Sequence, residues 1–280
     1  MSAPEPARFV PEALPWFAGT PWWPRFSVVE QRTANRLMGL LVNDIFLLIE
    51  RDLILPMARS AARDPAVQAR PGLPERLAEL VADERRHIAR FAAFARQHGA
   101  TGELAVARPP AGTALMARLA GLLPTWRALW WAVLATEEWT ITFADQVLAM
   151  PDGDAAYCAL HAAHRGDERR HVAVGSELGL AWDAAPAWRR AWAARAGVAL
   201  VRRLLLPCRA PRRLARAFIQ QHPRWRSDEC HLAQALARAG GGADYWRMVL
   251  PLGQASAAGQ AWRLRPAFAG LTSPIPGWTP

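Results

Sequence analysis

The sequence of 280 residues contains no lysine, because all 34 residues counted as Lys+Arg are arginines. This absence excludes a Walker-type phosphate loop, whose lysine contacts the nucleotide phosphates, and any enzyme that forms a lysine Schiff base. Cysteine is scarce as well: Cys158, Cys208 and Cys230 form no C-x-x-C pair. These cysteines predict neither a disulfide framework nor a zinc knuckle, and we expect a protein of the reducing cytoplasm.

Long hydrophobic runs are also missing from the sequence. No stretch reaches 18 uncharged apolar residues, and the nearest candidate is interrupted by Glu137 and Glu138. The N-terminus lacks the basic start and apolar core of a secretory signal. We therefore expect neither a membrane span nor secretion.

Negative charge is under-represented, and the formal net charge is +10. A basic surface could attract nucleic acid or an acidic partner protein. The alternative is a compositional bias, since a chain rich in Ala, Arg, Pro and Gly but free of lysine is typical of a GC-rich genome. We favour the bias, so nucleic acid is not expected as a partner, while an acidic carrier protein stays open.

Hydrophobic residues make up 52% of the chain, enough for a sizeable core. No stretch alternates apolar and polar residues as a strand does, so the predicted class is all-α. Helices are predicted from Ser27 to about Pro56 or a turn beyond, from Pro74 to Gly99, from about Pro124 to before Pro151, and from Asp154 to Gly179. The domain prediction divides the chain into an extended proline-rich arm (1–26), a four-helix bundle (27–185), additional helices packed on that bundle (186–263) and an irregular tail (264–280).

A doubled pentad is the strongest signal in the sequence. Asp83-Glu84-Arg85-Arg86-His87 recurs as Asp167-Glu168-Arg169-Arg170-His171, on the second and fourth predicted helices. Glu and His three residues apart share one face of a helix, so each pentad presents two metal ligands together. Two such pairs, with one glutamate from each of two other helices, are what a four-helix bundle uses to hold two iron or manganese ions.

The two remaining helices supply glutamates in apolar surroundings. Glu50 lies in the middle of a mostly apolar face of the first helix. Glu137 and Glu138 lie in the nearly all-apolar third helix, where a buried carboxylate is costly unless a cation or a donor compensates it. Either of these two could be the third-helix ligand.

His164 shares a stripe of the fourth helix with Glu168 and His171, so it is either a seventh ligand or a histidine that packs in the core or supports the ligands. For His161, one turn earlier, we expect a structural role. The residues expected to support the ligands without binding metal are Asp83, Asp167 and Glu138.

These residues resemble the ferritin-like di-iron oxygenases of the p-aminobenzoate N-oxygenase type. The resemblance covers about residues 16–180. Besides the pentads, it rests on the segment Phe17-Ala18-Gly19-Thr20-Pro21-Trp22-Trp23 with Phe26-Ser27 and Glu30-Gln31, and on the added histidine in His164-x-x-x-Glu168-x-x-His171. In that pattern the third-helix ligand is the first residue of a Glu-Glu pair, here Glu137. The resemblance implies the metal ligands Glu50, Glu84, His87, Glu137, His164, Glu168 and His171.

The resemblance also implies a ferritin-like fold with additional C-terminal helices and a homodimer. The implied reaction uses two irons, or manganese, to activate O₂ and oxygenate a small substrate, most often an arylamine nitrogen. No flavin or nicotinamide motif occurs in the sequence, so a separate reductase or electron carrier is expected to supply electrons. Two alternatives stay open: a di-metal hydroxylase of an aliphatic, carrier-bound or RNA-bound substrate, and a metal-binding bundle without enzymatic activity.

Overall fold

The computed structural model describes residues 7–98, 126–181 and 210–241, and the structural statements below concern these residues. They form helices, with no β-strand in these ranges, which confirms the all-α prediction. The expected linker at 108–112, the pieces expected at 186–209 and the tail at 264–280 lie outside the described residues. Within the described ranges, no helix is both long and apolar enough to cross a lipid bilayer.

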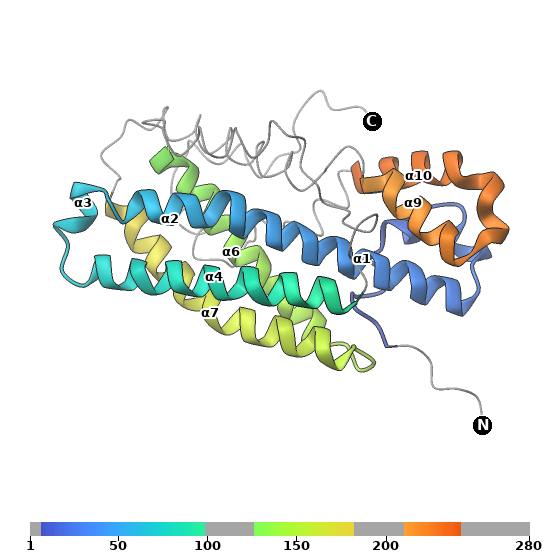
Figure 1. Cartoon of the computed structure of the whole chain (residues 1–280), viewed down its shortest axis with the longest axis horizontal. Helices are drawn as coiled ribbons and strands as arrows, with labels where there is room; N and C mark the ends of the chain where they lie inside the picture. The colour runs from blue at the N-terminus through green and yellow to red at the C-terminus, as the bar shows by residue number, and fades with distance from the viewer. Residues whose placement is uncertain (1–6, 99–125, 182–209, 242–280) are drawn as a thin grey trace.

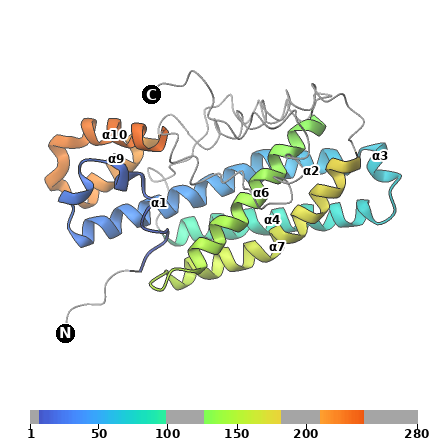
Figure 2. The ribbon, with the colours of Figure 1, turned by 180° about the vertical axis from the view of Figure 1, so that it is seen from behind.

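Four long helical segments form a bundle (Figure 1). The first is α1 (Val28–Ile49), continued by a π turn (Glu50–Ile54) and α2 (Leu55–Ala61). A short α3 (Pro65–Gln68) leads into α4 (Leu73–Gln97), which runs back along α1 and α2. Two further long helices, α6 (Trp126–Leu148) and α7 (Ala155–Ala181), pack against each other, and α7 also packs on α4 (Figure 2).

The helix ends follow the signals in the sequence. The Ser27 backbone amide donates to Glu30 Oε2 over 2.8 Å, and the Ser27 side chain accepts from the Glu30 amide, which makes the predicted capping box. Pro74 stands in the first turn of α4, where its missing N–H costs no hydrogen bond. The four predicted helices therefore begin and end close to the observed bounds.

The π turn at Glu50 departs from the single regular helix that the sequence predicts over this region. Its wider turn accommodates one extra residue and changes the direction of the side chains that follow. Pro56 stands just beyond it and has no N–H to offer to the preceding turn, so regular α-helical hydrogen bonding is interrupted there in any case. Glu50, at the start of this turn, is buried.

Residues 7–26 contain two short 3-10 turns, Trp16–Gly19 and Trp23–Arg25, and pack against the start of α1. The Asn35 side chain on α1 accepts hydrogen bonds from the amides of Phe9 (2.8 Å) and Val10 (3.2 Å) and donates to the Val10 carbonyl (2.6 Å). These hydrogen bonds hold the segment on the bundle and bury Phe9 and Val10 in the core.

A C-terminal helix pair, α9 (Ala210–Gln221) and α10 (Glu229–Gly241), lies at the end of the molecule where α1 begins. A 3-10 segment, Pro223–Asp228, joins the two helices. Phe26 packs against Phe218 and Trp225, with ring centroids 4.7 and 5.3 Å apart. These additional helices are thus fastened to α1 and to the N-terminal segment rather than to the middle of the bundle.

Candidate metal centre

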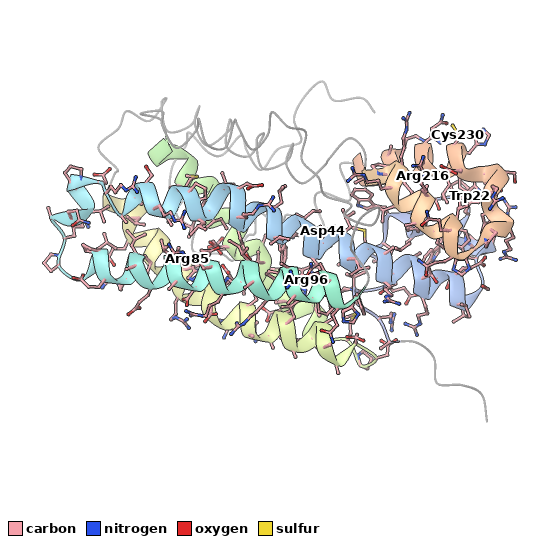
Figure 3. The ribbon with its side chains drawn as sticks, viewed as in Figure 1. Trp22, Asp44, Arg85, Arg96, Arg216 and Cys230 are labelled. Carbon is pink, nitrogen blue, oxygen red and sulfur yellow. The ribbon has the colours of Figure 1, made fainter. Side chains whose placement is uncertain are left out.

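The two pentads face each other across the contact between α4 and α7. His171 Nδ1 lies 3.1 Å from Glu84 Oε1 on the opposite helix and 3.5 Å from Glu168 Oε2 on its own helix. His87 Nδ1 lies 3.4 Å from Glu168 Oε1. All four side chains are at most 2% exposed, so the doubled motif forms one buried cluster. Arg85, which follows Glu84 directly, marks the level of this cluster along α4 (Figure 3).

Glu50 and His164 extend the cluster toward α1. His164 Nε2 lies 2.8 Å from Glu50 Oε1 and 2.8 Å from Glu168 Oε1. The π turn places the Glu50 carboxylate within 4.0 Å of His87 Nδ1 as well. Of the two roles open to His164, its contacts with two carboxylates in the site favour that of a ligand.

The neighbours Glu137 and Glu138 on α6 differ in position. Glu137 is 2% exposed, and its Oε2 lies 3.9 Å from His171 Nδ1. Glu138 is only partly buried. The structure thus brings Glu137 to the edge of the cluster, on the side of His171, and leaves Glu138 away from its interior.

The aspartates of the pentads pair with histidines in a crossed arrangement. Asp167 Oδ2 on α7 lies 3.0 Å from His87 Nε2 on α4, and Asp83 Oδ2 on α4 lies 3.3 Å from His171 Nε2 on α7. An ionised carboxylate only accepts hydrogen bonds, so each Nε2 carries the hydrogen. The Nδ1 atom of each ring is then free to bind a cation inside the cluster.

Arg170 joins the two aspartates from the surface. Its Nη2 lies 2.5 Å from Asp167 Oδ1 and 3.1 Å from Asp83 Oδ2. Burial works against ionisation of Asp167, but its contacts with His87 and Arg170 lower its pKa below the usual value. Arg170 thus contacts both aspartates, while Arg86 also pairs with Asp83 and Arg90 with Asp167, and these contacts orient the carboxylates beside the two histidines.

Many polar atoms of the cluster have no hydrogen-bond partner among the described residues. A buried polar atom left unpaired costs about 1–3 kcal/mol, and a charged one costs more. These atoms are one oxygen of Glu50, both oxygens of Glu84, Glu137 and Glu168, and the Nδ1 atoms of His87 and His171, whereas the unpaired Nδ1 of His164 is on the side of its ring away from Glu50 and Glu168. A concentration of unpaired carboxylate oxygens and ring nitrogens in one dry place is the arrangement that bound cations would satisfy.

The pKa values in the cluster are shifted because ionisable groups are buried close together. Burial, with help from the neighbouring carboxylates, raises the pKa of Glu50 well above its usual value. Burial also raises the pKa of Glu84 to about 7. Burial lowers the pKa of His87, whereas the carboxylates of Glu168 and Glu84 outweigh burial at His171 and raise its pKa to about 10. In the absence of a cation, protons on Glu50, Glu84 and His171 therefore offset the negative charge of the cluster.

The geometry provides for two cations. Two groups of four side chains each bring their ligand atoms within 4.8 Å of one another: Glu50, His87, His164 and Glu168, and Glu84, His87, Glu168 and His171. The groups overlap at His87 and Glu168, so the residues present would fit two adjacent metal ions, with Glu168 as the one carboxylate common to both groups. Glu137 stands beside the second group.

Two features of this region are not predicted from the sequence. The π turn has no characteristic residue pattern, although Pro56 indicates a disturbed helix near it. His161, expected to be structural, is fully buried one turn before His164, and neither ring nitrogen has a partner among the described residues. Its spacing of three from His164 places it on the ligand-bearing side of α7.

Comparison with known proteins agrees with this site. The family model of the p-aminobenzoate N-oxygenase AurF matches residues 2–240. The searches of curated proteins and of solved structures found no match. The matched segment includes all four helices of the bundle and both pentads, and it supports the ferritin-like assignment of the fold. The chain therefore belongs to the p-aminobenzoate N-oxygenase AurF family and is an oxygenase of the di-iron type.

Proposed function

We propose that the chain binds two iron ions and uses O₂ to oxygenate the amine nitrogen of a small aromatic amine. The observation that carries the proposal is the convergence of buried carboxylates and imidazoles whose inward atoms are unpaired, apart from His164 Nε2 and Glu50 Oε1, which contact each other. Carboxylates with imidazoles suit iron, and manganese would fit the same donors. The proposed ligands are Glu50, Glu84, His87, Glu137, His164, Glu168 and His171.

The charge balance supports two divalent ions. Four glutamates carry four negative charges when ionised, which matches the charge of two Fe²⁺ ions. Asp83 and Asp167 are both engaged by Arg170 and by the histidines, so they need no further cation. The four glutamates are thus the carboxylates that the metals would neutralise.

The reduced metal pair, when bound, supplies the two-electron activation of O₂. Overall, an amine R–NH₂, O₂, two electrons and two protons give R–NHOH and water. Within the chain, the aspartates orient His87 and His171 by accepting from Nε2, which fixes the tautomer that binds metal through Nδ1. Arg170 keeps both aspartates in place from the surface.

Aromatic side chains next to the cluster exclude bulk water from it. The rings of Phe46 and Phe91 lie 5.7 and 5.0 Å from that of His164, and both residues are buried. Exclusion of water strengthens electrostatic interactions and protects reactive species from wasteful proton transfer. A site shielded from water by these rings suits oxygen chemistry better than an exposed ion-binding site would.

Electrons must come from outside this chain, so a reductase or a small electron carrier is part of the proposal. A homodimer and a cytoplasmic location remain predictions.

Hydroxylation of an aliphatic, carrier-bound or RNA-bound substrate is the alternative reaction, and the family match favours N-oxygenation over it. We propose no metal-storage role.

The test uses iron-loaded protein, p-aminobenzoate, O₂ and a reduced plant-type ferredoxin. We expect a product that is heavier by one oxygen atom and carries the isotope when labelled O₂ is supplied. Glu84→Ala should take up less iron and form no such product. Iron-loaded protein that neither consumes O₂ nor oxygenates any member of a panel of arylamines contradicts the proposal.

A further inference from the structure

The three histidines of the cluster are not supported in the same way. His87 and His171 each have an aspartate at Nε2. His164 points Nε2 at Glu50 and Glu168, and its outward Nδ1 has no partner among the described side chains and backbone groups. A metal-bound histidine almost always donates its other ring N–H to a carboxylate, a carbonyl or a water molecule. The third imidazole thus lacks the support that the other two receive.

The other unpaired imidazole on α7 is that of His161. This residue is fully buried, and both of its ring nitrogens lack a partner in the described part of the chain. His161 and His164 are three residues apart, so their side chains are neighbours on one face of α7. Together the two rings leave three nitrogen atoms unpaired: both nitrogens of His161 and Nδ1 of His164.

The surroundings of His161 are aromatic and offer it no hydrogen bond. Its ring centroid lies 5.6 Å from that of Phe46, 5.1 Å from Phe143 and 4.4 Å from Tyr157. The Tyr157 hydroxyl donates to the Gly39 carbonyl over 3.2 Å, so its hydrogen is already used, and its oxygen is not in hydrogen-bonding geometry with either nitrogen of His161. Apolar packing alone would have favoured another phenylalanine at this position, because each unpaired buried nitrogen costs about 1–3 kcal/mol.

Neutral imidazoles have complementary hydrogen-bonding needs. With Nε2 of His164 directed at the metals, Nδ1 must carry the hydrogen and needs an acceptor. His161, which burial keeps neutral, has one donor and one acceptor. A buried water molecule typically makes two to four hydrogen bonds to such groups, and it can accept from His164 while it donates to His161.

We propose that His161 is a positioning residue for His164, acting through one buried water molecule that both imidazoles hold. The inference rests on the proposed function in one respect, namely that His164 is a metal ligand. His161 itself touches neither metal nor substrate. It fixes the tautomer and the ring orientation of the third imidazole, as Asp167 and Asp83 do for the other two.

The test compares Co²⁺ binding by the full-length wild type, His161→Phe, His161→Leu and His161→Gln. Co²⁺ gives a visible spectrum that reports the number and kind of its ligands. The matched control is His98→Phe, since the His98 ring also contacts a phenylalanine ring and has an unpaired Nε2, but lies at the end of α4.

We expect His161→Phe and His161→Leu to weaken one of the two Co²⁺ sites by about 10–100-fold and to change its spectrum. His161→Gln keeps a donor and an acceptor and should stay within about threefold of wild type. The control should match wild type. Thermal unfolding of the metal-free proteins should show that the Phe and Leu variants are folded, so that a weaker Co²⁺ site in them does not result from unfolding.

The inference is overturned by wild-type Co²⁺ affinity and spectrum in His161→Phe and His161→Leu, or by a His161→Gln protein as weak as those two. If the Phe and Leu variants fail to fold, His161→Gln with a site weakened by 10-fold or more overturns it as well. Wild type that binds no Co²⁺ overturns the proposed function together with the inference. Wild type with two sites that the His161 substitutions leave intact overturns the inference alone.

Discussion

Glu137 and Glu138 show how one position along a helix separates a buried group from a surface group. Their side chains point about 100° apart around α6, and only Glu137 is directed toward His171. From the residues alone either glutamate could be the ligand, and only the family pattern favoured Glu137. The structure supplies the orientation that composition and spacing could not.

Exchange of each carboxylate for an amide tests this difference. We expect Glu137→Gln to lower the metal content by about one ion per chain, because the amide removes one negative charge and one strong ligand from the site. Glu138→Gln should retain about two ions. Elemental analysis of both proteins after iron loading gives the answer, and the reverse pattern would move the ligand to Glu138.

Asp83 lies on α4 but accepts a hydrogen bond from His171 Nε2 on α7. Asp83→Asn should weaken metal binding by about 10–100-fold while the helices remain folded, because the amide is a poorer acceptor for the His171 N–H. Titration with Fe²⁺ under anaerobic conditions measures the change. Glu79→Gln, an exposed site one turn earlier on α4, is the control and should bind like wild type.

At the scale of helices, much of the architecture could be predicted from the sequence. The Ser27 capping box, Pro74 and the spacing within the pentads depend on local rules, so they give helix starts and ligand faces directly. The π turn at Glu50 could not be predicted, because no short pattern of residues specifies it and tertiary packing decides its place. The crossed pairing of Asp83 and Asp167 with the distant histidines likewise depends on how α4 and α7 pack.

Two glycines within helices, Gly39 and Gly166, lead to opposite predictions for the stability of their alanine variants. A Cβ at Gly39 in α1 would lie 2.4 Å from Phe9 Cβ, so Gly39→Ala should push the N-terminal segment off α1. We expect a loss of about 1–3 kcal/mol in the free energy of unfolding.

A Cβ at Gly166 in α7 would meet open space, since no described atom beyond its own helical turn lies within 4 Å of that position. Gly166→Ala should therefore gain up to about 1 kcal/mol from helix propensity. Urea unfolding of both variants against wild type measures the two changes. A stable Gly39→Ala protein would mean that Phe9 does not pack tightly against this turn.

At the scale of the whole molecule, one buried carboxylate connects the bundle to the C-terminal helix pair. Glu30 pairs with Arg224, accepts from Trp225 Nε1 over 2.6 Å and caps its own helix through Ser27. Burial opposes its ionisation, but Arg224, the Ser27 amide and Trp225 outweigh burial and lower the pKa of Glu30 to about 2. The native state therefore favours the ionised form of Glu30 more strongly than the unfolded state does.

Because its pKa is lower in the native than in the unfolded state, Glu30 contributes to the free energy of unfolding by an amount that depends on pH. Above the unfolded value of 4.5 the ionised group contributes fully, and the contribution disappears as the pH falls through 4.5 toward 2. At pH 7 we expect Glu30→Gln to lower the free energy of unfolding by about 2–3 kcal/mol, with the difference shrinking in acid. Urea unfolding from pH 7 to pH 3 measures it. A difference independent of pH would show that lost packing, not charge, explains the effect.

The most direct measurement of the central claim is the number of iron ions bound per chain. Protein loaded anaerobically with Fe²⁺, passed through a desalting column and analysed for metal should contain about two ions per chain. Glu168→Ala, which removes the carboxylate shared by both groups of ligands, should contain far less. Wild-type protein that retains almost no iron, or a Glu168→Ala protein that retains as much as wild type, would contradict a di-iron centre at this site.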